Sequence, residues 1–421
     1  MSSAFRILSK SVLVLLLTTF VPAILRAQSG PLRRSIRAGH SSPARNSVTP
    51  VPVSPGAWSQ LGQLVPNVSN NYFVVAYSVA IDGDTIVVGA FPTLTKDNGA
   101  AYVFTKPANG WSNLHSVASL NVPLSGGASS VAIQGDTIVV GVGNYTYGPG
   151  AAYVFERPAG GWKDMNPTAT LSSTDSMTGD NFGGSVSFDG NTIVVGSTGA
   201  DSATGAAYIY VEPAGGWSDM TETAKLTTSG APSGSGFPET VSLSGNTIVC
   251  GALGGAYVFV KPSTGWTDMT QTAKLSISGG GKTLFGSVSI SGDTILAGSV
   301  EGSAYIFVEP VTGWANMTQT ATLTAGDGDP DFGGPVLLNG STAVVGDSGR
   351  TVGPNFEEGG AYIFSEPKGG WKNMSSTTVL TASDARHFAW LGDAIGMSGT
   401  TLVLGAPAFQ FNGTAFVFGL P

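Results

Sequence analysis

The chain has 421 residues, of which 60 are Gly; only 11% are charged, while 42% are hydrophobic. This composition excludes an intrinsically disordered protein, because disordered chains have few apolar residues and many charges. After residue 57 the sequence holds 27 acidic residues against 12 Lys and Arg, a net charge of −15, which argues against nucleic acid as a partner because phosphate binding needs clustered cations.

Residues 1–27 have the pattern of a secretory signal peptide. Arg6 and Lys10 precede the apolar run SVLVLLLTTFVPAIL, and Ala27 is the predicted cleavage point. An uncleaved membrane anchor is the alternative, although the run is shorter than the roughly 20 residues that a spanning helix needs. We therefore expect a protein that is secreted, extracellular or periplasmic, or held at the cell surface, with no membrane insertion after signal cleavage.

Residues 28–55 are rich in Pro, Ser and Arg and contain no Asp or Glu. Such a composition predicts a flexible or extended tether. A polybasic binding arm is the alternative. The predicted divisions of the chain are therefore 1–27, 28–55 and 56–421.

Seven copies of one pattern fill residues 56–421. The first copy reads SVAIDGDTIVVGA at 78–90 and predicts a hairpin around a Gly turn. A third strand such as GAAYVF follows, and then a Trp element that ends in a fourth strand such as TAKL. Four strands per copy is the unit of a β-propeller blade. A linear solenoid is the alternative, but it would need capping copies at both ends. The copies are marked by Val79, Val131, Val186, Val241, Val288, Val336 and Ile395.

One Trp element has no strand before it. The segment GAWSQLGQLV at 56–65 matches later Trp elements, whereas the seventh copy ends at GTAFVFGLP without one. We therefore predict an all-β, seven-bladed β-propeller with four antiparallel strands per blade, whose N-terminal strand 56–65 pairs with 412–418 in the last blade. This pairing closes the ring and removes exposed strand edges. The seven Trp residues at this fixed position are expected to pack between blades.

The single cysteine, Cys250, excludes an internal disulfide. It stands in TIVCG, where other copies read TIVVG, so it replaces Val in a strand. We expect a buried, unreactive thiol.

The units resemble FG-GAP repeats, the units of the integrin alpha-chain β-propeller and of many bacterial secreted proteins. Literal FG occurs at Phe182-Gly183, Phe285-Gly286 and Phe332-Gly333, and GAP begins at Gly405. The resemblance implies a propeller fold, a role in adhesion or ligand binding, and in many family members calcium loops between the FG and GAP strands. Those loops are not carried over, because the tight hairpin from Val79 to Thr85, repeated in every copy, has no room for spaced carboxylates.

Two of the four connections in each copy vary in length, and both fall on one side of an up-and-down blade. Binding residues usually lie on such variable loops over a rigid scaffold. In the sixth copy these loops carry six carboxylates against one cation, Arg350. Oxygen-rich loops suit calcium, so these carboxylates are a candidate calcium site, as an alternative to the simpler expectation of a solvated acidic loop; the sequence indicates no other cofactor. The predicted ligands are Asp327, Asp329, Asp331, Asp347, Glu357 and Glu358.

A second candidate site lies in the last variable loop. Trp390 is the only Trp outside the seven regular positions, and Arg386 and His387 are close to it in sequence. An exposed aromatic ring beside a cation can stack on a sugar or a peptide side chain. The alternative is that Trp390 fills the core beside Leu391, which occupies the F position of FG.

The sequence contains no zinc-ligand spacing, no phosphate-binding loop and no nucleophile elbow. We expect a monomeric, non-catalytic binding or adhesion module that recognises an extracellular protein or glycan through the variable-loop face. The alternative is a sugar-processing hydrolase or lyase on the same propeller, which would need only two well-placed carboxylates. An enzyme would have a deep central pocket, whereas an interaction module would have a broad loop surface.

Overall fold

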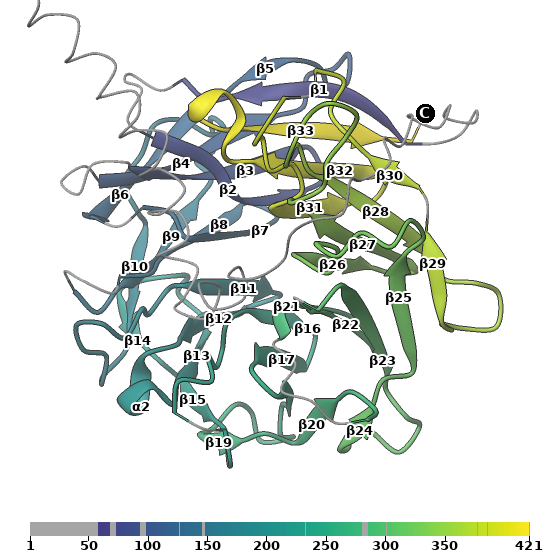
Figure 1. Cartoon of the computed structure of the whole chain (residues 1–421). Coiled ribbons are helices and arrows are strands. Elements are labelled where there is room, and N and C mark those ends of the chain that lie inside the picture. Colours follow the sequence, from purple (N-terminus) through teal and green to yellow (C-terminus); the bar gives the residue numbers. More distant parts are fainter. Residues whose placement is uncertain are drawn as a thin grey trace, which may run out of the picture. The chain divides into compact units, whose positions relative to one another are not determined.

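The computed structural model describes residues 58–67, 73–92, 98–125, 127–144, 148–231, 233–279, 285–299, 301–376, 378–384 and 386–420. These residues form seven small sheets arranged in a ring (Figure 1). The predicted all-β, seven-bladed propeller is confirmed for this part of the chain. The predicted signal peptide, 1–27, and tether, 28–55, lie outside the described residues.

Each blade contains four antiparallel strands, from the first at the ring centre, where the first strands of neighbouring blades meet, to the fourth at the rim. In blades 1 to 4 they are, in this order, β2 (Phe73–Asp82), β3 (Thr85–Pro92), β4 (Asn98–Thr105) and β6 (Ala118–Ser125); β7 (Ser130–Gln134), β8 (Thr137–Val142), β9 (Ala151–Glu156) and β10 (Ala169–Ser172); β11 (Ser185–Asp189), β12 (Thr192–Ser197), β13 (Ala206–Val211) and β15 (Ala224–Thr227); β16 (Val241–Ser244), β17 (Thr247–Ala252), β18 (Gly255–Val260) and β20 (Ala273–Ser276).

The remaining three blades follow the same plan. In blades 5 to 7 the strands are β21 (Phe285–Ser291), β22 (Thr294–Ser299), β23 (Ser303–Val308) and β25 (Ala321–Ala325); β26 (Val336–Asn339), β27 (Thr342–Asp347), β28 (Gly360–Ser365) and β30 (Val379–Leu380); β31 (Ala394–Ser398), β32 (Thr401–Ala406), β33 (Thr414–Gly419) and β1 (Ser59–Val65). Two short helices, α2 (Ala200–Ala203) and η2 (Phe409–Phe411), lie on connecting loops. None of the helices in the described residues has the length and apolar character needed to span a membrane.

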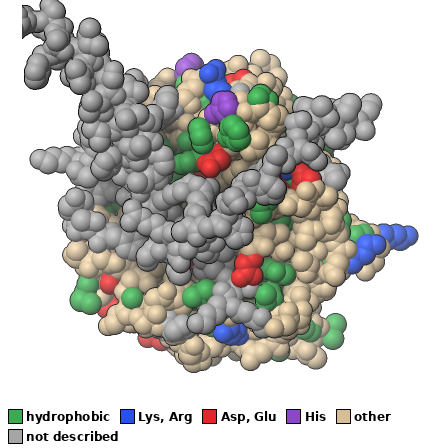
Figure 2. Space-filling view, viewed as in Figure 1, with side chains coloured by type: hydrophobic (Ala, Val, Ile, Leu, Met, Phe, Trp, Pro, Cys, Tyr) green, Lys and Arg blue, Asp and Glu red, His purple; other side chains and the backbone are tan. Residues whose placement is uncertain are grey.

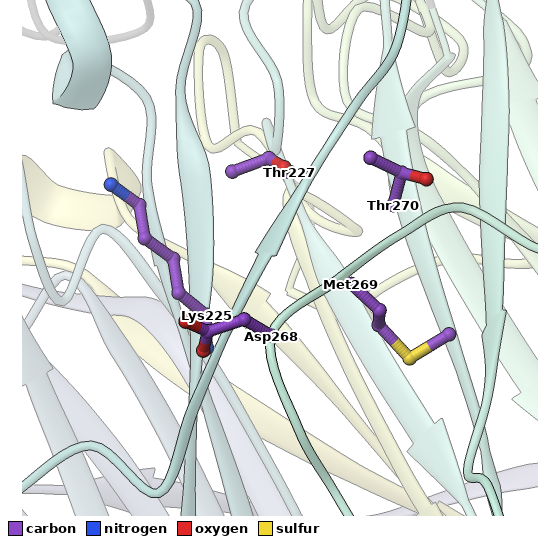
Figure 3. A pocket seen from close by; sticks show the side chains of 5 residues that line it. All are labelled: Lys225, Thr227, Asp268, Met269 and Thr270. Atoms are coloured by element: carbon purple, nitrogen blue, oxygen red, sulfur yellow. The ribbon is translucent and has the colours of Figure 1, made fainter.

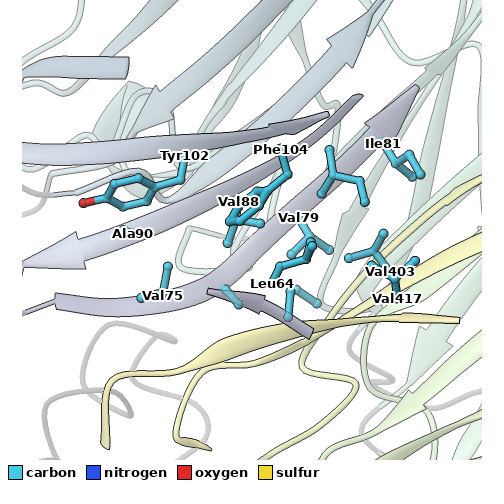
Figure 4. Packing of buried hydrophobic residues seen from close by; sticks show 14 of the residues in the cluster. Leu64, Val75, Val79, Ile81, Val88, Ala90, Tyr102, Phe104, Val403 and Val417 are labelled. Carbon is cyan, nitrogen blue, oxygen red and sulfur yellow. The ribbon is translucent and has the colours of Figure 1, made fainter. Parts of the chain in front are cut away.

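The first and last strands of the described chain close the ring. β1 pairs antiparallel with β33, and the register places Ser59 opposite Gly419 and Leu64 opposite Ala415. Figure 1 shows the purple β1 beside the yellow β33. Leu64 is fully buried, and Figure 4 shows it packed with Val403 and Val417 of blade 7 and with residues of blade 1. The predicted closure is therefore confirmed.

Five sheets contain a fifth strand that the sequence pattern did not predict. It is a piece of two or three residues from the next copy, and it pairs parallel with the fourth strand of the blade before it. Each piece follows a Trp, so the Trp element crosses the blade boundary and covers the rim edge of its neighbour, which limits unwanted pairing. These strands are β14 (Met220–Thr221), β19 (Met269–Thr270), β24 (Met317–Thr318), β29 (Met374–Ser376) and β5 (Leu114–His115).

A hydrogen bond beside each Trp fixes this crossing. The side chain two residues after the Trp accepts a backbone N–H from the preceding blade, at or just past its fourth strand, at 2.8–2.9 Å in all seven copies. The interaction therefore satisfies a backbone N–H at the rim, and it fixes the position of each blade relative to its neighbour. The acceptors are Gln60, Asn113, Asp164, Asp219, Asp268, Asn316 and Asn373.

The hydrophobic core is divided among the seven boundaries between blades. Each of seven buried clusters combines residues of two adjacent blades, and each contains one Trp from the regular positions. Six of these Trp side chains are 5–8% exposed, and Trp58 is partly buried against the cluster between blades 6 and 7. The predicted structural role of these residues is confirmed. Cys250 is also fully buried, and burial raises the pKa of its thiol, as expected for an unreactive cysteine.

The glycine near the end of each second strand allows close contact with the next blade. A Cβ at Gly141 would lie 2.3 Å from the Gly183 carbonyl oxygen, and one at Gly346 would lie 2.2 Å from that of Gly392. Any larger residue would push the blades apart, which explains why the run TIVV is followed by Gly in copy after copy.

Candidate functional site

The variable connections of neighbouring blades meet on one face of the ring. In blade 6 the segment 326–335 leads into β26, and the segment 348–359 joins β27 to β28. Contacts between Asp327 and Arg350 bring these two loops together. The prediction that the carboxylates of blade 6 gather on one edge therefore holds for the loops, although their side chains divide into two groups.

The first group surrounds a buried arginine. Arg350 is 5% exposed, and its Nη2 lies 2.5 Å from Oδ2 of Asp327. Its Nη1 lies 3.7 Å from Oδ2 of Asp329 and 3.9 Å from Oδ2 of Asp347. The guanidinium also donates to the Tyr362 hydroxyl and lies over the Tyr362 ring, 5.2 Å from its centroid. Arg350 thus supplies positive charge at the centre of the acidic cluster.

The Tyr362 hydroxyl extends this network by donating a 2.7 Å hydrogen bond to Oδ1 of Asp327. Asp327 therefore accepts from both Arg350 and Tyr362. These two hydrogen bonds and the nearby charge outweigh partial burial, and they lower the pKa of Asp327. Asp327 stays ionised as the main counter-ion of Arg350.

Asp331 lies beside this group, because its carboxylate packs against the backbone of Gly349 and its charge helps to raise the pKa of Asp347. Glu357 and Glu358 instead face the last variable loop of blade 7. Within the described residues, no group of three or more acidic, His or Cys side chains is arranged to hold a metal ion. The six carboxylates do not form one ligand shell, because Arg350 occupies the centre of one group and the loop backbone separates the other.

Two buried carboxyls have strongly perturbed pKa values. Asp347 and Glu358 are both 0% exposed. Burial, reinforced by Asp329 and opposed by Arg350, raises the pKa of Asp347 to about 8. Burial and the nearby Asp384 raise the pKa of Glu358 to about 7, although Asn355 donates to its Oε2 at 3.2 Å. Desolvation dominates at Asp347 because neither of its carboxyl oxygens accepts a hydrogen bond within the described residues.

We expect the free energy of unfolding to decrease between pH 5 and pH 8. The folded pKa values of Asp347 and Glu358 lie above their unfolded values, so the folded state keeps protons that the unfolded chain has released. Their contribution is complete below about pH 4 and is lost as the pH rises through 7 to 8. Each carboxyl changes the free energy of unfolding by about 1.4 kcal/mol per pH unit inside this window.

Denaturant unfolding at pH 5 and pH 8 measures this effect. Asp347→Asn should remove about half of the pH dependence, because the amide does not ionise. Asp84→Asn is the control, because its side chain is 76% exposed. A wild-type free energy of unfolding that is constant from pH 5 to 8 would contradict the assignment.

An exposed aromatic patch lies where the loops of blades 6 and 7 meet. Phe356 is 62% exposed and Phe388 is 54% exposed. The His387 ring stacks on Phe356 with centroids 5.9 Å apart and planes 26° apart, and the Phe388 ring centroid lies 6.3 Å from that of His387. Figure 2 shows hydrophobic, basic, acidic and His side chains gathered in the upper part of this face. We call Phe356, His387, Phe388 and Trp390 the aromatic patch.

Hydrogen bonds lock the two loops of the patch together. Nδ1 of His387 accepts from the Phe356 N–H at 3.1 Å, and the Phe388 N–H donates to the Phe356 carbonyl at 2.8 Å. Trp390 donates from Nε1 to Glu357 Oε2 at 2.9 Å. Glu357, Phe388 and Trp390 all have φ between 49° and 57°, a conformation that non-glycine residues seldom adopt. Backbone strain of this kind is concentrated at functional sites.

The structure links His387 to Phe356 and Trp390 to the adjacent Glu357, and it places Arg386 at the margin of the patch. The Arg386 guanidinium lies over Phe409, 5.4 Å from the ring centroid. Leu391 is 1% exposed and fills the F position of FG, so Trp390 is left partly exposed. Sequence reasoning missed Phe356 and Phe388. Both are aromatic residues in variable loops, but Trp390 was selected because it is the only Trp outside the regular positions.

A shallow pocket of about 480 Å³ lies at the rim of blade 3 (Figure 3). Lys225 and Thr227 of β15 and Asp268, Met269 and Thr270 around β19 line it. The Lys225 ammonium is engaged by Asp175 at 2.6 Å and by Asp201 at 2.7 Å. The pocket therefore follows from the parallel pairing at the rim, and its lysine is already paired with two carboxylates.

The fold and these loops define a repeat-built β-propeller with a rigid ring and one face of variable loops. A family model described as FG-GAP repeat matches residues 58–104 and 166–210. These matches and the seven-bladed ring fit an FG-GAP repeat β-propeller, similar to that of integrin alpha chains, as the sequence resemblance implied. Both matched segments run from a fourth strand to the third strand of the following blade.

Among solved structures, the fold is similar to that of the computationally designed Ika8 protein. The TM-score is 0.50 at 12% sequence identity, and the match covers 86% of this chain and 99% of the Ika8 chain. At this identity the similarity concerns the fold alone. No curated protein matches the sequence.

Proposed function

We propose that the protein is a secreted or cell-surface, monomeric, non-catalytic binding module that recognises an extracellular protein or glycan through the aromatic patch. The FG-GAP propeller fold is typical of binding and adhesion modules. The observation that carries the proposal is the pair of exposed rings, Phe356 and Phe388, on interlocked loops above a rigid ring. The signal-like residues 1–27 support export.

Exposed rings and preorganised loops both favour binding at the aromatic patch. Large exposed apolar groups that cluster on a soluble protein mark interaction sites, and aromatic and Arg side chains dominate binding hot spots. The bonds from Phe388 to Phe356 and from Trp390 to Glu357 hold the loops before a partner arrives. Less conformational entropy is therefore lost on binding.

The surrounding charges fit a ligand with an apolar face and a polar edge. The Phe356 and Phe388 rings can pack against the C–H face of a sugar or an apolar peptide side chain, while Arg386 and Glu357 lie at the margin for hydroxyl or amide groups. A non-catalytic role is supported by the acidic cluster, because Asp327 and Asp329 are engaged by Arg350.

We expect the double variant Phe356→Ala and Phe388→Ala to weaken ligand binding at least tenfold, which corresponds to about 1.4 kcal/mol. Ligands selected by the wild-type protein from a glycan array and from a displayed peptide library would be titrated against both proteins. The variant should keep its melting temperature, because both rings are exposed.

Val311→Ala is the matched control. This side chain is fully exposed and lies on a third-to-fourth connection, on the opposite face of the ring. Equal affinity of the wild type and the double variant for every selected ligand would contradict the proposal. A ligand lost only in Val311→Ala would move the binding surface to the other face.

A further inference from the structure

In blade 3, a carboxylate is held by three side chains. Asp175 Oδ1 accepts from the Tyr208 hydroxyl at 2.7 Å and from the Ser173 hydroxyl at 3.1 Å. Asp175 Oδ2 accepts from the Lys225 ammonium at 2.6 Å. The ammonium also lies over the Tyr208 ring, 5.5 Å from its centroid. Tyrosine, lysine and hydroxyl donors thus form a cradle for one carboxylate on the variable-loop face.

Blade 6 repeats this arrangement with a different cation. The Tyr362 hydroxyl donates to Asp327, and Arg350 takes the place of the lysine. Tyr208 and Tyr362 occupy the same position of the third strand, and Asp175 and Asp327 each stand four residues after the Leu of the preceding fourth strand. The repeat therefore provides a defined place for a carboxylate beside its tyrosine.

Blade 4 has the donors and lacks the carboxylate. Tyr257 and Lys274 are paired across β18 and β20 in the register of Tyr208 and Lys225, and the ammonium lies 5.4 Å from the Tyr257 ring centroid. The residue four positions after Leu226 is Gly230. The position that bears a carboxylate in two other blades has no side chain here.

The geometry around Tyr257 is otherwise unchanged. Phe237 packs edge-on against Tyr257 with centroids 5.5 Å apart, the same separation as between Phe182 and Tyr208. The cradle of blade 4 therefore has the same aromatic support as that of blade 3.

Three donors remain unused in this cradle. Within the described residues, the buried hydroxyls of Tyr257 and Thr228 have no hydrogen-bond partner, and the Lys274 ammonium forms no ion pair. Thr228 stands two residues after its Leu, as Ser173 does in blade 3. Tyr257 is 1% exposed. A buried donor without an acceptor is unfavourable, so an incoming acceptor that pairs with it is strongly favoured.

We propose that blade 4 binds the carboxylate group of a ligand between Tyr257, Lys274 and Thr228. The ligand carboxylate replaces the missing Asp side chain, with one oxygen on the tyrosine and threonine hydroxyls and the other on the ammonium. Such charge-assisted bonds are short and strong. The carboxylate can come from a uronic acid of a glycan or from an acidic peptide side chain, and this site is independent of the aromatic patch.

The proposal is tested by titrating the whole chain with acetate. Binding is measured from the melting temperature and by calorimetry, and chloride at equal ionic strength is the reference. Acetate should raise the wild-type melting temperature. Tyr257→Phe and Lys274→Met should each weaken acetate binding at least tenfold, whereas Lys372→Met, an exposed lysine in another blade, should not. Acetate binding that is absent, or equal in the wild type and Tyr257→Phe, overturns the proposal.

A second comparison separates binding from a structural role. Without acetate, Tyr257→Phe should keep the wild-type melting temperature because its hydroxyl has no partner to lose, whereas Tyr208→Phe should lower it. Asp175→Gly should create a second acetate site in blade 3, and failure to gain one counts against the cradle. Glucuronate and an Asp-containing tripeptide then identify the source of the carboxylate by which of them binds more tightly than acetate.

Discussion

A chain that begins at residue 68 is expected to melt as a whole at a lower temperature, because it lacks β1. That strand supplies the fourth strand of blade 7 and the surface on which β5 pairs. Losing the burial of Leu64 alone costs about 2 kcal/mol, and β33 becomes an open edge. A domain is stabilised by only about 5–15 kcal/mol in total, so the loss affects every blade.

Calorimetry of two truncated chains measures this expectation. A chain that begins at residue 58 keeps β1 and should melt in one transition close to that of the full chain. The chain that begins at residue 68 should show a single transition several degrees lower, because one kcal/mol shifts the melting point of a domain of roughly 150–250 residues by about 2–4 °C and that of a larger domain by less. Identical melting temperatures would mean that β1 does not close the ring.

Replacing the buried cation is expected to have the second largest effect. Arg350→Met leaves Asp327 and Asp329 without their counter-ion, and removing one partner of a buried ion pair costs about 3–5 kcal/mol. Denaturant unfolding at pH 7 would measure the change. Arg157→Met is the control, because its pair with Asp136 is exposed and should contribute less than about 1 kcal/mol.

The same variant tests the predicted calcium site. In the wild type, calcium would have to compete with Arg350 for Asp327 and Asp329. We expect calcium to leave the wild-type melting temperature unchanged and to recover part of the stability lost in Arg350→Met. If Arg350→Met without calcium were as stable as the wild type, Arg350 would not be the counter-ion of the cluster.

The fold was predictable because the sequence pattern of one blade recurs seven times. The copies specify the hairpins and the count of blades, and the unmatched Trp58 specifies how the ring closes. The fifth strands were not predictable, because pieces such as Met269–Thr270 are too short to show periodicity. The crossing of each Trp element onto the neighbouring blade depends on tertiary contacts, which the sequence of a single copy does not show.

The candidate sites were predictable in place and only partly in chemistry. Variable loops located the cluster of blade 6 and the region of Trp390. Spacing along the chain could not show that Arg350 turns inward among the carboxylates, since its position depends on two loops 23 residues apart. Likewise the stacking of Phe356 on His387 joins loops of two different blades, 31 residues apart in sequence.

The pairing of β1 with β33 has a mechanical consequence. Because the two strands are antiparallel and Ser59 lies opposite Gly419, both chain ends leave the sheet from the same end of the pair. A force applied between these ends acts along the interstrand hydrogen bonds and breaks them one after another, as in opening a zipper. We therefore expect this closure to yield at low force when it is pulled by its two ends, although the whole ring is expected to resist heat as one unit.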